Sequence, residues 1–191
     1  MSSDLFKGLV SGSRWETLSR VVRGRTRHVV VVLENVMDRG NENAVLRSVD
    51  AFGFQDVHLI YSEKQNASNN KAKRRKQSMN ICRTDAGARK WLSVREWHST
   101  KACLRDLAAR GYCIAIASPS APCTVANLPL ERKLAVVFGN EHSGVSDEGL
   151  EAADLSFRLP MCGFVESLNV SVAAAITMYE LRGRMPVSGH G

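Results

Sequence analysis

Short apolar runs alternate along the chain with longer segments in which apolar residues recur every three to four positions. Unbroken runs are typical of strands buried on both faces, and the wider spacing is typical of helices. The runs that predict strands are 28–33, 57–61, 112–117, 134–138 and 155–159. Because strands separated by helices usually pair in parallel through right-handed crossovers, the pattern predicts an α/β fold built on a parallel sheet.

Helical spacing is found in 13–23, 41–52, 100–110 and a final alanine-rich segment from about Leu168. Ser13 and Glu16 fit a capping box at the start of the first segment. Gly53 is well placed to end the second. Asn41 and Ser167 are candidate N-caps of the second and last helices, since both residue types favour that position.

Polar segments follow two of the predicted strands. Phe138 is followed by Gly-Asn-Glu-His-Ser-Gly, and the run that ends at Leu159 is followed by a loop that leads to Ser167-Leu168-Asn169. Ligands of open α/β sheets bind at the carboxyl edge of the strands. We therefore expect the active site where these two strand ends meet.

Composition narrows the class of protein. The chain has 191 residues, 44% hydrophobic and 24% charged, which is ordinary for a soluble globular protein. It contains no G-x-G-x-x-G and no P-loop sequence, which argues against a Rossmann dehydrogenase and a P-loop enzyme. No apolar run is long enough to span a membrane, and the N-terminus lacks the basic region of a signal peptide, so no membrane association is expected.

The cysteines indicate the compartment. There are five, an odd number, and no Cys-x-x-Cys pair. This argues against a disulfide framework and a zinc knuckle. We expect a reducing compartment, cytoplasmic or an organellar matrix, and no metal.

The chain carries a formal charge of +7, which suggests a polyanionic partner, although it could also serve solubility alone. Two basic groups are candidates for contact with the phosphates of a nucleic acid. One lies on the first predicted helix and the other in a predicted surface loop that follows residue 62. The residues are Arg14, Arg20 and Arg23, and Lys71, Lys73, Arg74, Arg75 and Lys76. The alternatives for the second group are a solvated charge run or a localisation signal.

Three ordered motifs carry a family resemblance. Residues 41–53 (NENAVLRSVDAFG), 138–146 (FGNEHSGVS) and 159–175 (LPMCGFVESLNVSVAAA) resemble the three signatures of the SpoU/TrmH branch of the SPOUT RNA methyltransferases. The resemblance covers most of residues 14–182 and is strongest to the tRNA enzymes that methylate the ribose 2′-hydroxyl of a D-loop guanosine. It implies an RNA 2′-O-methyltransferase that uses S-adenosylmethionine and no metal.

The resemblance also implies an architecture. We expect a helical arm over 1–26 and a parallel-sheet SPOUT domain over 27–186. Within that domain we expect a deep trefoil knot at about 134–182, followed by a disordered tail over 187–191. The resemblance further implies a homodimer with composite active sites. The apolar residues Val172, Ala173 and Ile176 of the last helix suit either a helix contact between subunits or packing within one subunit.

Individual roles follow from the matched motifs. Arg47 matches the family arginine proposed to activate the ribose hydroxyl. Because free arginine is a poor base, it would orient the hydroxyl or stabilise charge, helped by a neighbouring phosphate. Asn41 would position Arg47 or the substrate, and Glu141 would orient a group of the site or the partner's arginine. Ser167 and Asn169 complete the predicted catalytic set. The residues expected around the cofactor are Ser118, Gly139, Asn140, Leu159, Met161, Leu168 and Asn169.

Two alternatives remain open at this point. One is a 2′-O-methyltransferase of ribosomal or another RNA, because the chain ends soon after Arg184-Met185-Pro186, where bacterial tRNA enzymes carry a further helical extension. The other is a catalytically silent RNA-binding SPOUT module.

Overall fold

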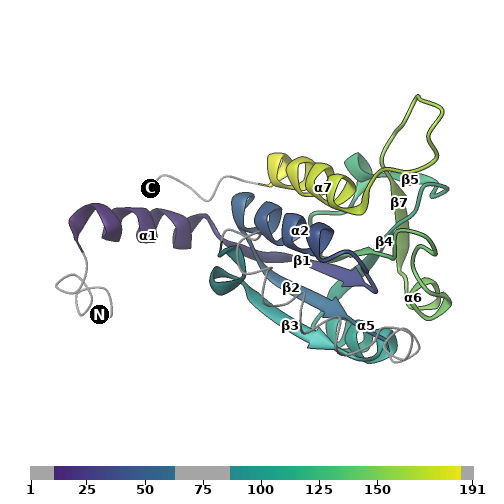
Figure 1. Ribbon diagram of the computed structural model, residues 1–191, viewed down its shortest axis with the longest axis horizontal. Coiled ribbons are helices and arrows are strands. Elements are labelled where there is room, and N and C mark those ends of the chain that lie inside the picture. Colours follow the sequence, from purple (N-terminus) through teal and green to yellow (C-terminus); the bar gives the residue numbers. More distant parts are fainter. Residues whose placement is uncertain (1–10, 63–86, 186–191) are drawn as a thin grey trace.

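A computed structural model describes residues 11–62 and 87–185 of the chain. Its centre is a seven-stranded sheet in which every pair of neighbouring strands is parallel (Figure 1). The strand order is β3-β2-β1-β6-β4-β7-β5. The strands are β1 (Thr26–Glu34), β2 (Phe54–Ile60), β3 (Ser93–Trp97), β4 (Tyr112–Ala117), β5 (Cys123–Thr124), β6 (Lys133–Phe138) and β7 (Leu155–Arg158). The predicted parallel α/β fold is confirmed.

Helices cover both faces of this sheet. Helices α2 (Arg39–Ala51) and α7 (Val170–Arg184) pack together on one face, and α5 (Thr100–Ala109) and α6 (Asp147–Glu151) lie on the other (Figure 1). Alternate residues of β1 serve the two cores: Val29, Val31 and Leu33 face the α2–α7 side, and Val30 and Val32 face the α5 side. An unbroken apolar run is required for this two-sided burial, which is why such runs predict the central strands well.

The helix starts differ from the predictions. Helix α1 (Gly12–Gly24) begins after Ser11 without a side-chain cap bond, so the capping box at Ser13 is wrong. Asp38, and not Asn41, caps α2 by accepting a hydrogen bond from the Gly40 amide at 2.6 Å. Asn169, and not Ser167, caps α7 by accepting from the Ser171 amide at 2.9 Å. Each start has several Ser, Asn or Asp residues nearby, and spacing alone does not choose among them.

Gly53 ends α2 as expected. It has a φ of +74°, and a Cβ at this position would lie 2.8 Å from the carbonyl oxygen of Gly24. The left-handed turn and the close approach both require glycine. The turn after α2 therefore packs closely against the last residue of α1, just before β1 begins.

Two short strands were missed. β3 and β5 lie at the two edges of the sheet, and β3 carries exposed Arg95 and Glu96, so neither has an apolar run. Two short 3-10 helices, η1 (Ala88–Trp91) and η2 (Val125–Asn127), complete the described elements. None of the described helices combines the length and apolar composition needed to cross a membrane. The trefoil knot stays a prediction, and the tail over 187–191 lies outside the described residues.

Candidate active site

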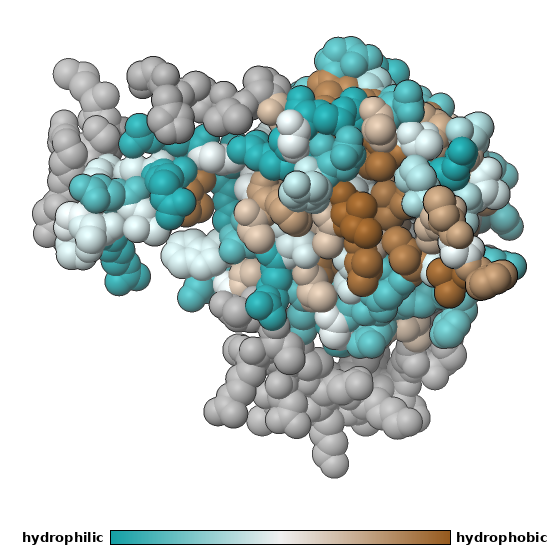
Figure 2. Space-filling model, turned by 90° about the horizontal axis from the view of Figure 1, so that it is seen from above, coloured by the Kyte–Doolittle hydropathy of each residue, from teal (hydrophilic) through white to brown (hydrophobic). Residues whose placement is uncertain are grey.

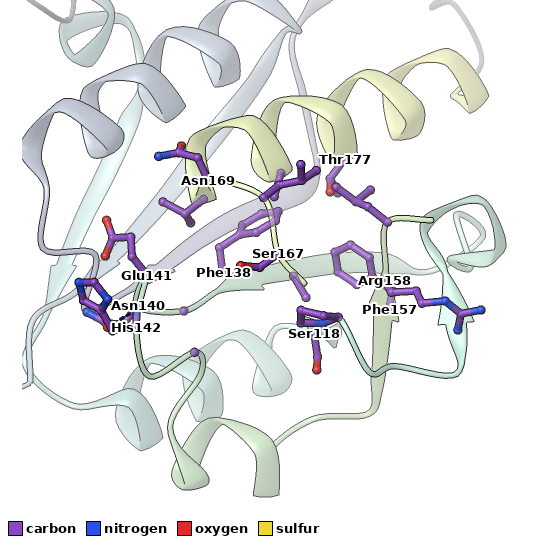
Figure 3. A pocket seen from close by; sticks show the side chains of 18 of the residues that line it. Ser118, Phe138, Asn140, Glu141, His142, Phe157, Arg158, Ser167, Asn169 and Thr177 are labelled. Atoms are coloured by element: carbon purple, nitrogen blue, oxygen red, sulfur yellow. Dashed lines mark hydrogen bonds between the residues drawn. The ribbon is translucent and has the colours of Figure 1, made fainter. Parts of the chain in front are cut away.

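A pocket of about 480 Å³ opens at the carboxyl ends of β4, β6 and β7, under the first turns of α7 (Figure 3). Two loops form much of its wall: residues 139–146, which follow β6, and residues 160–168, which follow β7. Nine of the predicted site residues line it: Ser118, Gly139, Asn140, Glu141, Leu159, Met161, Ser167, Leu168 and Asn169. The prediction that the two strand ends meet is therefore confirmed.

Asn140 builds the first loop. Its side-chain oxygen accepts from the backbone amides of His142 at 2.9 Å and Ser143 at 3.0 Å, and its side-chain nitrogen donates to the Asn35 carbonyl at 2.9 Å. Its backbone also forms both hydrogen bonds of a bridge with Gly144, each 2.9 Å. Its side chain thus holds the pocket wall in shape, while its predicted contact with the cofactor remains a prediction.

Glu34, at the end of β1, anchors the same loop from beneath. It is buried, with 1% of its surface exposed, and accepts hydrogen bonds from the Ser146 amide at 2.9 Å and the Ser146 hydroxyl at 2.6 Å. The Thr100 hydroxyl of α5 donates to the same carboxylate. Glu34 was not predicted as a site residue, although an acidic residue directly after an apolar run is a recognisable signal.

Gly139 allows the loop to fold back on itself. A Cβ at this position would lie 2.2 Å from the carbonyl carbon of Gly144 and 2.3 Å from the Val145 amide nitrogen. Both are backbone atoms that the bridge at Asn140 holds in place. No other residue fits here without displacing the loop, so Gly139 is needed for the shape of the wall.

A chain of side-chain amides and a carboxylate crosses the mouth of the pocket. The Asn41 amide nitrogen donates to Glu141 at 2.9 Å, and the Asn169 amide nitrogen donates to the Asn41 oxygen at 3.0 Å. Asn169 in turn accepts from the Ser171 amide and hydroxyl at the start of α7. Three predicted catalytic residues, each from a different signature, are therefore directly linked.

Glu141 is held as a carboxylate. Burial acts to raise the pKa of this group, but hydrogen bonds from the Asn41 side chain and from the backbone amides of Glu141, Met37 and Asp38 outweigh burial and lower the pKa. The Met37 amide donates to its second oxygen at 3.3 Å. With these donors in place, Glu141 serves to orient Asn41.

Arg47 lies outside the pocket. Its side chain is exposed on α2, and it forms no side-chain hydrogen bond or ion pair with any residue in the described ranges. Asn41 and Arg47 are six positions apart, so they point to different sides of the helix. One subunit therefore does not bring Arg47 to the amide chain.

The predicted RNA contacts lie elsewhere. Arg14, Arg20 and Arg23 are exposed on α1, which leaves the sheet at the end opposite the pocket (Figure 1). The second basic group, with Lys71, Lys73, Arg74, Arg75 and Lys76, lies outside the described residues.

The pocket suits S-adenosylmethionine on two grounds. The rings of Phe138 and Phe157 meet edge to face, with centroids 6.4 Å apart, and give it an apolar interior for a flat base. From Pro160 to Leu168 the backbone forms no hydrogen bond with another described residue, so its amides and carbonyls can bind a ligand. Neither phenylalanine was singled out from the sequence, because apolar strand residues of this kind usually only pack.

Known proteins resemble this chain in sequence. The sequence profile of the SpoU rRNA Methylase family matches residues 28–179. The tRNA (guanosine(18)-2'-O)-methyltransferase of Borreliella burgdorferi is 35% identical over 170 residues, which are 88% of this chain and 72% of that protein. The 23S rRNA (guanosine-2'-O-)-methyltransferase RlmB of Nitrosomonas europaea is 34% identical over 168 residues, 87% of this chain and 61% of that protein.

A solved structure extends the likeness to three dimensions. The TrmH/SpoU tRNA modifying enzyme of A. aeolicus superimposes with a TM-score of 0.74 at 28% identity, over 90% of this chain and 82% of that one. The profile match includes both pocket loops and the start of α7. The chain therefore belongs to the SpoU rRNA methylase family of RNA methyltransferases.

Proposed function

We propose that the protein transfers a methyl group from S-adenosylmethionine to the ribose 2′-hydroxyl of a guanosine in the tRNA D-loop. The observation that carries this proposal is the hydrogen-bonded chain Glu141–Asn41–Asn169 at the mouth of a pocket whose second wall has free backbone groups. The family supports the reaction type and the cofactor. The tRNA enzymes among its relatives support the substrate.

The cofactor supplies an electrophilic methyl group, and the residues of this chain position the nucleophile. The transfer is an in-line displacement in which the ribose oxygen forms a bond to the methyl carbon and loses its proton. Asn41, fixed by Glu141 and Asn169, presents a polar group beside the ribose. A metal is not required, because alignment and the removal of one proton complete the reaction.

Arg47 of a second subunit completes the site in this proposal. Its exposed guanidinium, without a side-chain partner in the described chain, is free to reach across an interface to the ribose and its phosphate. The outer face of α7 suits that interface, since Val172, Ile176 and Tyr179 are 46%, 42% and 69% exposed and lie one helical turn apart. Apolar side chains gather on this side of the molecule (Figure 2). We expect a homodimer.

Labelled S-adenosylmethionine tests the reaction and the substrate together. The purified protein should label unmodified tRNA at a D-loop guanosine, as found by nuclease mapping of the methylated nucleotide. Label confined to ribosomal RNA would replace the tRNA proposal with the rRNA alternative. Cofactor binding without transfer to any RNA would favour the silent RNA-binding module.

Mixed subunits test the composite site. Arg47→Ala should lose methyl transfer but bind S-adenosylhomocysteine normally, and Leu168→Trp should block the pocket while keeping Arg47. Neither variant should be active alone. A random mixture should regain about a quarter of wild-type activity, because half of the dimers are mixed and each has one complete site. No recovery in a mixture shown by sedimentation to exchange subunits would reject the composite site.

The arginines of α1 are proposed to bind RNA phosphates away from the reacting nucleotide. They are exposed and lie at the far end of the sheet from the pocket. Replacing Arg14, Arg20 and Arg23 by Ala should weaken tRNA binding and lower the log–log salt slope by about two to three units if each contacts one phosphate. The matched control replaces the basic residues of 71–76. If the salt slope is unchanged in the α1 variant but reduced in the 71–76 variant, residues 71–76 and not the α1 arginines contact the phosphates.

A further inference from the structure

One buried hydroxyl of the pocket has no partner. Thr177 lies on α7 with none of its surface exposed, and it lines the pocket. Its Oγ1 forms no hydrogen bond with any residue in 11–62 or 87–185. Buried side-chain polar atoms nearly always have a partner, so an unpaired one on a cavity wall indicates that the partner is a ligand.

Two other helical hydroxyls of the described chain have a partner within their own helix. The Ser48 hydroxyl donates to the Ala44 carbonyl and the Thr17 hydroxyl to the Ser13 carbonyl, each at 3.0 Å. This bond to the carbonyl four residues earlier is the usual outlet for a helical hydroxyl. Thr177 does not form it, so its hydroxyl is available to a group inside the pocket.

The surroundings of this hydroxyl restrict what it can bind. Thr177 lies on the side of α7 that faces Phe138 and Phe157, whose rings form the apolar interior (Figure 3). An amino-acid tail carries two charges that would be costly to bury among these groups. A purine has apolar faces and a rim of nitrogen donors and acceptors. Its faces can pack against the two phenylalanine rings while its rim forms a hydrogen bond with the hydroxyl.

We infer that the Thr177 hydroxyl forms a hydrogen bond with the adenine base of the cofactor and thereby helps the pocket to select a purine. The inference rests on the proposed use of S-adenosylmethionine. A hydroxyl can donate to a ring nitrogen or accept from the exocyclic amino group, so either edge of the base would satisfy it. The hydroxyl that is unpaired in the free protein would then gain its partner on binding.

Calorimetry with S-adenosylhomocysteine tests this assignment, using variants that separate the hydroxyl from the shape of the side chain. Thr177→Val removes the hydroxyl at nearly constant volume and should weaken binding about tenfold. Thr177→Ser keeps the hydroxyl and should bind within about threefold of wild type. Thr17→Val, on exposed α1, is the matched control and should bind normally.

Thermal unfolding without ligand gives an independent readout. Because Thr177→Val removes an unpaired buried hydroxyl, the free protein should unfold at the same or a higher temperature than wild type. A purely structural hydroxyl would give a lower unfolding temperature and unchanged affinity, and that pair of results would overturn the inference.

Fragments of the ligand locate the contact. The affinity loss in Thr177→Val should persist with 5′-methylthioadenosine, which lacks the amino-acid tail, and with its 2′,3′-dideoxy form, which lacks the ribose hydroxyls. Disappearance of the loss with either fragment would assign the hydroxyl to the missing group and reject the base. Failure of the wild type to bind S-adenosylhomocysteine would instead count against the proposed function.

Discussion

The loop over 139–146 and the loop over 160–168 both border the pocket, but they are held in different ways. The first is fixed by the Asn140 side chain, by its bridge with Gly144 and by the buried carboxylate of Glu34. The second makes no backbone hydrogen bond to another described residue, and its Phe164 and Val165 are exposed. One wall is built before the ligand arrives, and the other has its backbone groups free to meet it.

This difference assigns separate tasks to the two walls. A preformed wall lowers the ordering cost of binding and fixes the position of Glu141. A wall with unpaired backbone groups gains hydrogen bonds from the ligand and should become ordered around it.

Adding one methyl group to each wall should have opposite outcomes. Gly139→Ala would place a Cβ 2.2 Å from a backbone carbon, so we expect a loss of unfolding free energy of about 3 kcal/mol or more, or no folded protein. Gly163→Ala is the matched control in the second loop, where a Cβ meets nothing within 4 Å, and it should be neutral. Urea denaturation measures both. Equal stability of the two variants would remove the basis for calling the first wall rigid.

The anchor beneath the first wall is the next target. Glu34→Gln removes the negative charge that strengthens three hydrogen bonds and leaves one acceptor oxygen in place of two, so the unfolding free energy should fall by about 2 kcal/mol. Glu131→Gln, at an exposed carboxylate, serves as the control in the same denaturation series and should change little. A neutral Glu34→Gln would show that the loop does not depend on this anchor.

Ligand binding should change the two walls unequally. At saturating S-adenosylhomocysteine, amides of 160–168 should exchange hydrogen more slowly by a factor of at least about ten. They gain hydrogen-bond partners, and the loop must release the ligand before it can open. Amides of 139–146 should already be protected in the free protein. Hydrogen exchange with mass spectrometry compares the segments directly, and equal changes in both would contradict the division of tasks.

Acid should weaken the hydrogen bond between Asn41 and Glu141, at the mouth of the pocket, only slightly. The pKa of Glu141 is lowered in the folded protein, so its contribution to stability is complete above the pKa of the unfolded chain, about 4.3, and is lost as the pH falls through the lower folded value. The difference in stability between wild type and Glu141→Gln should therefore be constant at neutral pH and shrink only below about pH 4. A difference that instead grows as the pH falls from about 6 to 4 would show that the pKa of Glu141 is raised in the folded protein.

The sequence predicted the frame of the site better than its contacts. Central strands were found because two-sided burial demands unbroken apolar runs, and their carboxyl ends carry polar segments that must meet at one edge. Edge strands β3 and β5 lack such runs and were missed. The gathering of Asn41, Glu141 and Asn169 followed from the three motifs, but their hydrogen bonds depend on side-chain directions that spacing does not give.

Thr177 shows a further limit of the sequence. It shares one face of α7 with buried Val170, Ala174 and Leu181, so it reads as a tolerated polar residue in an apolar stripe. Its spacing was a usable signal for burial. Only the three-dimensional arrangement shows that its hydroxyl has no partner and borders a cavity.

The links among Asn41, Glu141 and Asn169 also have a consequence for biosynthesis. They join residues 100 and 128 positions apart in the sequence, and the last partner is the cap of the final described helix. During translation, a nascent chain that stops short of that helix has Asn41 and Glu141 but lacks Asn169, the second residue that orients Asn41. The mouth of the pocket is completed only when the segment that carries Asn169 has left the ribosome, so products truncated before it cannot present a finished site to RNA.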